Sequence, residues 1–223
     1  MTDFIYELKS ELTLRGVEFI KTIDISMLTE KENRGYNNAL LIGFTLSPGF
    51  IYRFSKENIP DPGEFFQKEH AIDAMAEWTA EFIKQKGYEA YAQSEKNIIA
   101  DGLITEPQKR SPLPHKKIAL LSGLGWIGKN NLLVTKEFGC AVVICTVLTN
   151  APLPKENQDI VVTGCGGCSV CVDICQSKAL HGTVWSADVD RDLMIEISRC
   201  SFCLRCLTDC PWTQKYMDEN YKN

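Results

Sequence analysis

Two short stretches of this 223-residue chain carry cysteines at a spacing typical of iron–sulfur cluster ligands. Each has the pattern C-x2-C-x2-C-x3-C, in which three closely spaced thiolates bind one cubane and the fourth reaches a second one. The first run contains Cys165, Cys168, Cys171 and Cys175, and the second contains Cys200, Cys203, Cys206 and Cys210. We therefore predict two [4Fe–4S] clusters with crossed ligands, the first on Cys165, Cys168, Cys171 and Cys210 and the second on Cys200, Cys203, Cys206 and Cys175.

The residues around the runs leave two alternatives to weigh. Pro211 follows Cys210, as in the bacterial pattern, whereas Gln176 stands where the first run would have its proline. Structural zinc sites usually show pairs of C-x2-C instead of two such four-cysteine runs, and disulfides suit a secreted chain. Cys140 and Cys145 lie outside the runs and are predicted to be buried small apolar residues, with a redox or ligand role as the alternative.

Composition limits what the rest of the chain can form. Hydrophobic residues make up 44% of the sequence, and the formal net charge is −5. A chain of this length can hold one large domain or one domain plus a small module, and an acidic chain is a poor default binder of nucleic acid. The first residues lack the apolar core of a signal peptide, and the apolar stretch 140–148 is too short to span a bilayer. We predict a soluble, cytoplasmic protein that does not enter a membrane.

Hydrophobic periodicity predicts a mixed α+β chain. Helical spacing covers residues 4–15 and 64–86, and strand patterns cover residues 17–25, 39–46 and 88–92. Residues 131–135 and 140–149 flank the turn KEFG, which predicts a hairpin, and the proline-rich residues 105–116 predict a loop. The composition of the sequence changes after residues 151–154, before the cysteine runs begin. We therefore predict an α/β domain over residues 1–154 and a cluster module over residues 155–223.

The segment SGLGWIGKNN, residues 122–131, looks like a nucleotide-binding loop but fits neither common type. A P-loop needs Ser or Thr after its lysine, whereas Asn130 follows Lys129. A dinucleotide fingerprint needs a helix after the glycines and an acidic residue about 20 positions on, and neither is evident. Two interpretations remain: a tight turn required for packing, or a close approach of the backbone to a large cofactor.

The order of these motifs resembles the epoxyqueuosine reductase family. The resemblance rests on KIALLSGLGWIGKNNLLVT, then TVLTNAPLP, then the two cysteine runs, and it covers about residues 115–212. It implies a nitroreductase-like α/β domain followed by a bacterial 2[4Fe–4S] ferredoxin-like module, a plan that is similar in reductive dehalogenases. It also implies a bound cobalamin, with a cavity shaped by Gly123, Leu124, Gly125, Trp126, Gly128 and Lys129.

The same resemblance implies an oxidoreductase. Electrons from a donor such as a ferredoxin or flavodoxin would pass through the two clusters to a bound cobalamin or to a substrate, and the partner would be a corrinoid or a small-molecule substrate. Three alternatives stay open: a ferredoxin-like electron carrier without its own substrate, a reductive activator of a separate corrinoid protein, and the tRNA-modifying enzyme in minimal form.

Two departures from the family pattern argue against a tRNA substrate. The tRNA-modifying members carry an acidic residue in a D-S-x-P-like segment, where this chain has KRSPLPHKK, residues 109–117. They also carry a C-terminal helical-repeat extension, whereas this sequence stops at Asn223. His115 takes the conspicuous place in the changed segment, and we predict that it is catalytic, as a proton donor or a group near cobalt or substrate. The alternative is a surface histidine in a loop.

Overall fold

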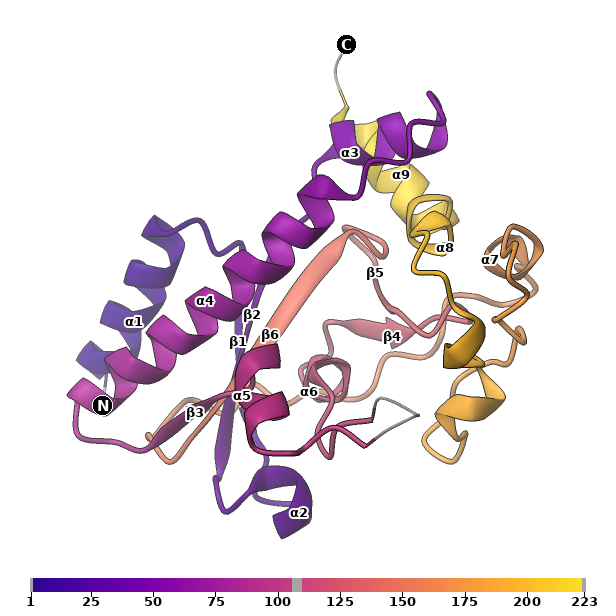
Figure 1. Ribbon diagram of the computed structural model, residues 1–223. Coiled ribbons are helices and arrows are strands. Elements are labelled where there is room, and N and C mark those ends of the chain that lie inside the picture. The colour runs from indigo at the N-terminus through magenta and orange to yellow at the C-terminus, as the bar shows by residue number, and fades with distance from the viewer. Residues whose placement is uncertain (1, 106–109, 222–223) are drawn as a thin grey trace. The chain divides into compact units, whose positions relative to one another are not determined.

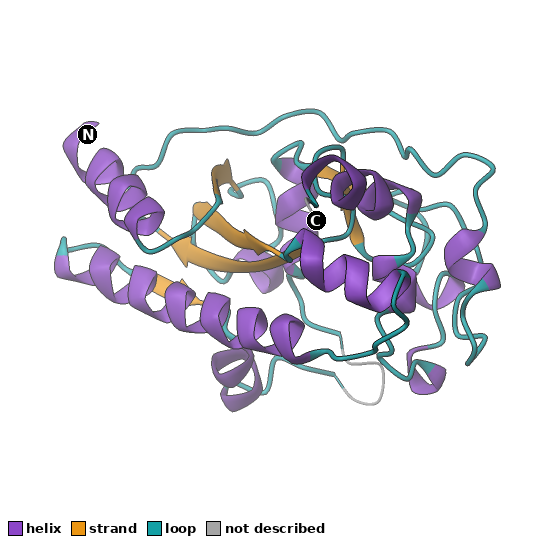
Figure 2. Ribbon diagram, turned by 90° about the horizontal axis from the view of Figure 1, so that it is seen from above, coloured by secondary structure: helices purple, strands orange, loops and turns teal. Residues whose placement is uncertain are grey.

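Helices and strands both build this protein, as the sequence predicts (Figures 1 and 2). The structure, a computed structural model, describes residues 2–105 and 110–221. These residues form two compact units. The first contains residues up to 44, 67–123 and 143–159, and the second contains residues 45–66, 124–142 and 160 onward.

The first unit is built on a four-stranded sheet in the order β1-β2-β6-β3. Its strands are β1 (Phe19–Asp24), β2 (Asn38–Thr45), β3 (Ala90–Ala92) and β6 (Val142–Thr149). β1 pairs antiparallel with β2 from Phe19 opposite Gly43, and β3 pairs antiparallel with β6 from Ala90 opposite Thr149. β2 is buried at five successive residues, 39–43, so both of its faces are covered, as expected of a central strand.

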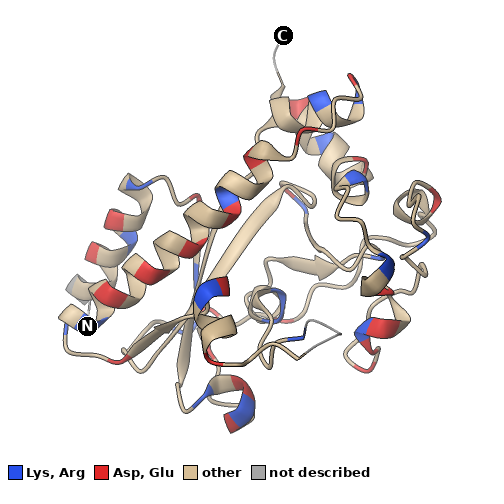
Figure 3. Ribbon diagram, viewed as in Figure 1, with Lys and Arg blue, Asp and Glu red and all other residues tan. Residues whose placement is uncertain are grey.

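Helices complete the first unit. They are α1 (Thr2–Leu14), α2 (Glu30–Asn33), most of α4 (Gly63–Gln85), α5 (Glu95–Ala100) and α6 (His115–Leu121). Ile72, Ala76 and Ile83 form the apolar stripe that buries α4, and Gly87 ends the helix segment with a left-handed φ of 87°. α1 contacts the end of α4 through Phe4 and Phe82, whose ring centroids are 6.3 Å apart. Acidic and basic residues are interspersed along both helices (Figure 3).

The second unit contains the cysteine runs and a small hairpin. Its elements are α3 (Pro48–Ser55), β4 (Gly125–Ile127), β5 (Leu133–Thr135), α7 (Val170–Asp173), two 3-10 turns (Arg191–Leu193 and Ile197–Arg199), α8 (Arg205–Thr208) and α9 (Pro211–Asn220). α3 packs on α8 and α9, and the hydroxyl of Tyr216 donates a hydrogen bond to the carbonyl of Leu46 over 3.0 Å. This bond ties the last helix to the start of α3.

The predicted hairpin between residues 131–135 and 140–149 is wrong. β5 pairs with β4 instead, and β6 joins the sheet of the first unit. The local turn signal is nevertheless real, because Thr135 and Gly139 form an isolated antiparallel bridge around it. The chain reverses there, but the longer strand gains more by pairing with β3 and β2 than by extending a short ribbon.

The predicted loop over residues 105–116 is only partly open to comparison, because residues 106–109 lie outside the described residues. Thr105 and Arg110 form an isolated bridge, and His115 begins α6 instead of lying in the loop. In the described part of the chain, no helix combines the length and apolarity that a membrane crossing needs.

The β4–β5 hairpin leaves no room for a side chain at Gly125. A Cβ added there would lie 2.1 Å from the carbonyl oxygen of Val134. We expect Gly125→Ala to lower the free energy of unfolding by about 1–3 kcal/mol, because the two strands must move apart. Gly49→Ala is the matched control, since Gly49 lies in the first turn of α3 and an added Cβ meets only ordinary contacts of 3.6 Å or more. Thermal unfolding without oxygen measures both variants, and equal stability of the two would contradict the steric account.

Candidate metal centres

Both cysteine runs fold as tight loops that end in short helices. In the first run, the amide of Cys168 donates to the carbonyl of Cys165 over 2.9 Å, and α7 follows. In the second run, Phe202 and Leu204 adopt left-handed backbone with φ of 51° and 58° before α8 begins. This conformation is uncommon for residues other than glycine, and such strain clusters at functional sites.

The thiol of Cys171 lies among the other members of the first predicted ligand set. Burial raises its pKa to about 11, and the nearby thiols of Cys210, Cys165 and Cys168 raise it further in that order. A repulsion of this kind requires the four sulfurs to be electrostatic neighbours. Cys210 comes from the second run, so its place in this group is the one that the crossed ligand scheme requires.

Cys206 is surrounded in the same way by the second predicted set. Burial raises its pKa to about 12, followed by the effects of Cys203, Cys200, Cys171 and Cys175. Cys175, from the first run, is therefore a neighbour of the second set, and Cys171 connects the two groups. A small apolar core of Ala179, Leu180 and Ile195 packs against Cys171, Cys175, Cys200 and Cys206.

Hydrogen-bond donors surround two of the predicted ligands. The amide of Ala179 donates to the sulfur of Cys175 over 3.3 Å. Burial alone would raise the pKa of Cys175, but hydrogen bonds from Ser177 and from backbone amides outweigh this effect, so the pKa is lowered. The pKa of Cys210 is lowered to about 7, first by a hydrogen bond from Cys140, against burial, and then by the amides of Trp212 and Thr213. Such donors stabilise thiolate, the form that binds metal.

No three or more Cys, His, Asp or Glu side chains in the described residues are placed to hold a metal ion. A cubane carries its ligands on four separate iron corners, so its thiolates need not converge on one point. The grouping of the thiols fits two cubanes in this respect, and the ligand sets stay a prediction.

The end of the glycine loop contacts both cysteine runs. The ammonium group of Lys129 donates to the carbonyls of Gly166 and Cys168 over 2.8 and 2.9 Å. The amide of Asn130 donates to the carbonyl of Cys206 over 2.8 Å and to the sulfur of Cys140 over 3.3 Å. Two adjacent side chains thus bind the backbones of the two ligand loops. Sequence analysis used Asn130 only to reject a P-loop and missed this role, which no spacing could have revealed.

The space beside the glycines of this loop is occupied by the chain's own atoms. A Cβ on Gly123, whose φ is 67°, would lie 2.7 Å from the side chain of Gln158, and one on Gly128 would lie 2.5 Å from that of Asn130. Trp126 is buried and Leu124 is half-buried. A tight turn required for packing therefore accounts for these glycines, and their predicted contact with a cofactor stays a prediction.

His115 lies in the first unit, where it begins α6 and is half-buried. Its Nδ1 shares a hydrogen bond of 3.0 Å with the hydroxyl of Thr146, and burial lowers its pKa to about 4 although Asp73 opposes the shift. Asp73 also accepts a hydrogen bond of 2.8 Å from the amide of Glu95. Cys145 is fully buried beside it, and its pKa is raised by burial and then by Asp73. Sequence analysis did not associate Asp73 or Thr146 with His115.

The two cysteines outside the runs are buried, as predicted. Cys145 belongs to the His115 surroundings, whereas Cys140 contacts the predicted ligand Cys210. A hydrogen bond with Cys210 and burial raise the pKa of Cys140, so this thiol keeps its proton. Its amide is held by the hydroxyl of Thr213 over 2.8 Å.

Comparisons with known proteins agree with the resemblance to epoxyqueuosine reductases. No protein-family model matches the chain. A stretch of 137 residues is 32% identical to the epoxyqueuosine reductase of Lactococcus garvieae (strain Lg2). The matched stretch covers 61% of this chain and 38% of that relative. The chain therefore spans well under half the length of that relative.

Solved structures share the fold over nearly the whole chain. A selenomethionine-labelled epoxyqueuosine reductase aligns with a TM-score of 0.62 at 15% identity, over 98% of this chain and 67% of that one. A reductive dehalogenase, whose structure is described as suggesting a mechanism for B12-dependent dehalogenation, aligns with a TM-score of 0.65 at 14% identity, over 92% of this chain and 31% of that one. The chain thus has an epoxyqueuosine reductase-like fold, structurally similar to that of a reductive dehalogenase, and it is a distant homologue of the epoxyqueuosine reductases.

Proposed function

We propose that this protein is a small iron–sulfur reductase that passes electrons through two [4Fe–4S] clusters to a bound cobalamin or substrate. The observation that carries the proposal is the grouping of the thiols around Cys171 and Cys206, because each group combines cysteines from both runs. Distant homology to epoxyqueuosine reductases supports it. The finer architecture that we propose is a nitroreductase-like domain over residues 1–154 and a ferredoxin-like module over residues 155–223.

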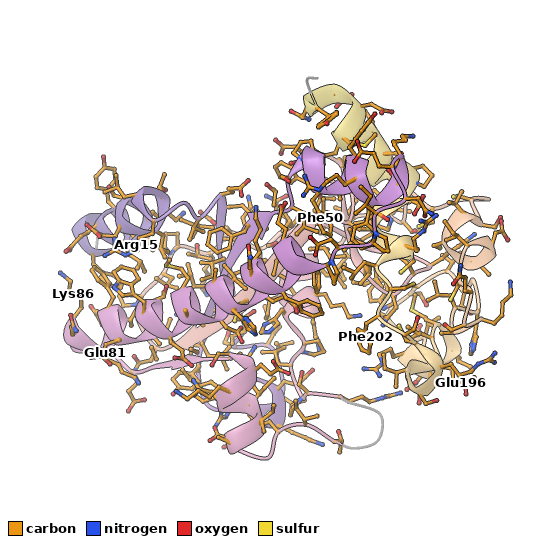
Figure 4. The ribbon with its side chains drawn as sticks, turned by 45° about the horizontal axis from the view of Figure 1, so that its top comes forward. Arg15, Phe50, Glu81, Lys86, Glu196 and Phe202 are labelled. Carbon is orange, nitrogen blue, oxygen red and sulfur yellow. The ribbon has the colours of Figure 1, made fainter. Side chains whose placement is uncertain are left out.

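Electrons would enter at the second cluster. Its predicted ligand Cys203 is exposed, whereas Cys210 of the first set is only 8% exposed. Phe202, between two ligands of the second set, is 59% exposed, and Figure 4 shows its side chain together with that of Glu196 in this part of the chain. An exposed aromatic side chain beside an accessible cluster suits a transient protein donor, such as a ferredoxin or flavodoxin, since weak electron-transfer contacts are small.

Cobalamin is the acceptor that the fold suggests, and it would supply a low-valent, nucleophilic cobalt. The glycine loop, from Gly123 to Lys129, would lie along it, but the space beside its glycines is filled by the protein's own atoms. This packing favours a second candidate function: an electron carrier, or a reductive activator of a separate corrinoid protein, without a cobalamin of its own.

Cofactor analysis of the protein purified without oxygen tests the proposal. We expect about eight iron atoms and about eight sulfides per chain, and a corrin absorbance that co-elutes with the protein after incubation with hydroxocobalamin. Iron at this level without co-eluting corrin would select the carrier or activator. Zinc in place of iron, or no iron after reconstitution, would contradict both functions.

The crossed ligand scheme predicts which variants share a defect. Cys175→Ser and Cys203→Ser should both remove the EPR signal of the second cluster, because each loses one of its four thiolates. Cys168→Ser and Cys210→Ser should both remove the signal of the first cluster. Cys145→Ala is the control and should keep both signals, since Cys145 lies in the first unit. The crossing is wrong if Cys175→Ser gives the spectrum of Cys168→Ser.

His115 predicts a pH dependence of stability. Its pKa is about 4 in the folded chain, below the ordinary value of 6.5, so the unfolded chain binds more protons between these values. Stability is therefore complete above about pH 6.5 and falls as the pH drops toward about 4, by up to about 3 kcal/mol. In His115→Gln the melting temperature should fall less between about pH 7 and about pH 5 than in the wild type, with His70→Gln as an exposed control. Equal falls in wild type and His115→Gln would show that the imidazole is not held in its neutral form.

A further inference from the structure

Trp126 carries a buried polar group whose partner is missing among the protein atoms. Its side chain is 1% exposed, and its indole Nε1 has no hydrogen-bond partner in the described residues. A buried donor without a partner costs about 1–3 kcal/mol, and nearly all such groups in native proteins are satisfied. An acceptor outside the polypeptide, either a bound group or a water molecule, would satisfy this N–H.

The six-membered ring of Trp126 lies against Gly164. Its atoms Cζ2 and Cη2 lie 2.7 and 3.0 Å from the position that a Cβ on Gly164 would occupy. Nε1 is bonded to Cε2, the neighbour of Cζ2, so the N–H is next to this part of the ring. Gly164 directly precedes Cys165, the first ligand of the first predicted set. A side chain at Gly164 would displace this part of the ring, and glycine leaves it in place.

The indole also contacts Trp212, which is close in sequence to the fourth ligand of the same set. Trp212 packs edge-on against Trp126, with ring centroids 5.1 Å apart and an interplanar angle of 76°. Its Cζ2 also lies 3.0 Å from the Cβ position of Gly164. Trp212 is two residues from Cys210 and Gly164 directly precedes Cys165, so the indole contacts residues that are close in sequence to both of these predicted ligands.

Lys129 holds the first ligand loop in this arrangement. Its ammonium group binds the carbonyls of Gly166 and Cys168, on either side of the loop, and it follows Trp126 by three residues on the same segment. The hairpin that carries the indole therefore also binds the loop that follows Gly164.

We infer that the indole N–H of Trp126 donates a hydrogen bond to a sulfur of the cluster bound by Cys165, Cys168, Cys171 and Cys210. This inference rests on the proposed function, which supplies the cluster. Each added electron makes the cluster more negative, so a donor to its sulfur stabilises the reduced form and raises the reduction potential. Trp126 would thus raise the reduction potential of one of the two clusters without being one of its ligands.

Substitution of Trp126 by phenylalanine removes the N–H and keeps an aromatic ring, so it separates the effect of the hydrogen bond from the effect of packing. In reconstituted Trp126→Phe, we expect the full iron content and an EPR-monitored redox titration in which the first cluster is reduced about tenfold less at equilibrium, a shift of about 59 mV to lower potential. The second cluster should keep its potential. Trp78→Phe is the matched control, because Trp78 lies on α4 in the first unit, and both potentials should stay at their wild-type values.

A spectroscopic measurement on the wild type covers the case in which Trp126→Phe does not fold. With ¹⁵N-indole tryptophan, ENDOR of the reduced first cluster should show an exchangeable proton and a coupled indole nitrogen. A wild type with about eight iron atoms that lacks this coupling, or a folded Trp126→Phe with unchanged potentials, would overturn the inference and leave the proposed function intact. A wild type without iron would instead contradict the proposed function.

Discussion

Thiolates repel one another, and several of them share a small volume only where a positive centre compensates their charge. Cys171 and Cys206 each lie among cysteines of both runs, and burial together with these neighbours raises their pKa values to about 11 and about 12. The polypeptide alone therefore keeps these two thiols protonated at neutral pH. Binding of the proposed clusters would have to expel those protons, so cluster assembly would be coupled to the compact arrangement of the two runs.

The hairpin between the glycines and Thr135 organises this arrangement. Its two strands lie too close together for a side chain at Gly125. The side chains of Lys129 and Asn130, in the loop of the hairpin, donate hydrogen bonds to the backbones of the two cysteine runs. This turn thereby binds the backbones of both predicted ligand loops, which are separated by the 24 residues 176–199. A segment that resembles a nucleotide-binding loop in its glycines serves here as a brace, because the groups that it binds are carbonyls of its own chain.

Features that depend on local pattern were predictable, and those that depend on tertiary contact were not. The long helix α4 and the strand β2 follow from hydrophobic periodicity, and the cysteine runs follow from spacing alone. The turn after Thr135 was also recognised, but β6 found its partners in strands distant in sequence, which no local signal encodes. The surroundings of His115 were missed for the same reason, since Asp73 and Thr146 come from α4 and β6.

The polar groups beside the predicted ligands share one chemical character. The amide of Ala179 donates to Cys175, the amides after Cys210 donate to its sulfur, and the buried indole N–H of Trp126 has no partner among the described residues. All of these groups are hydrogen-bond donors, and donors stabilise negative charge. Surroundings of this kind suit a centre whose negative charge rises when an electron arrives, because each donor then binds a more negative sulfur. The donors therefore support the proposed redox role of the cysteine runs, although donors of the same kind also stabilise the thiolates of a structural metal site.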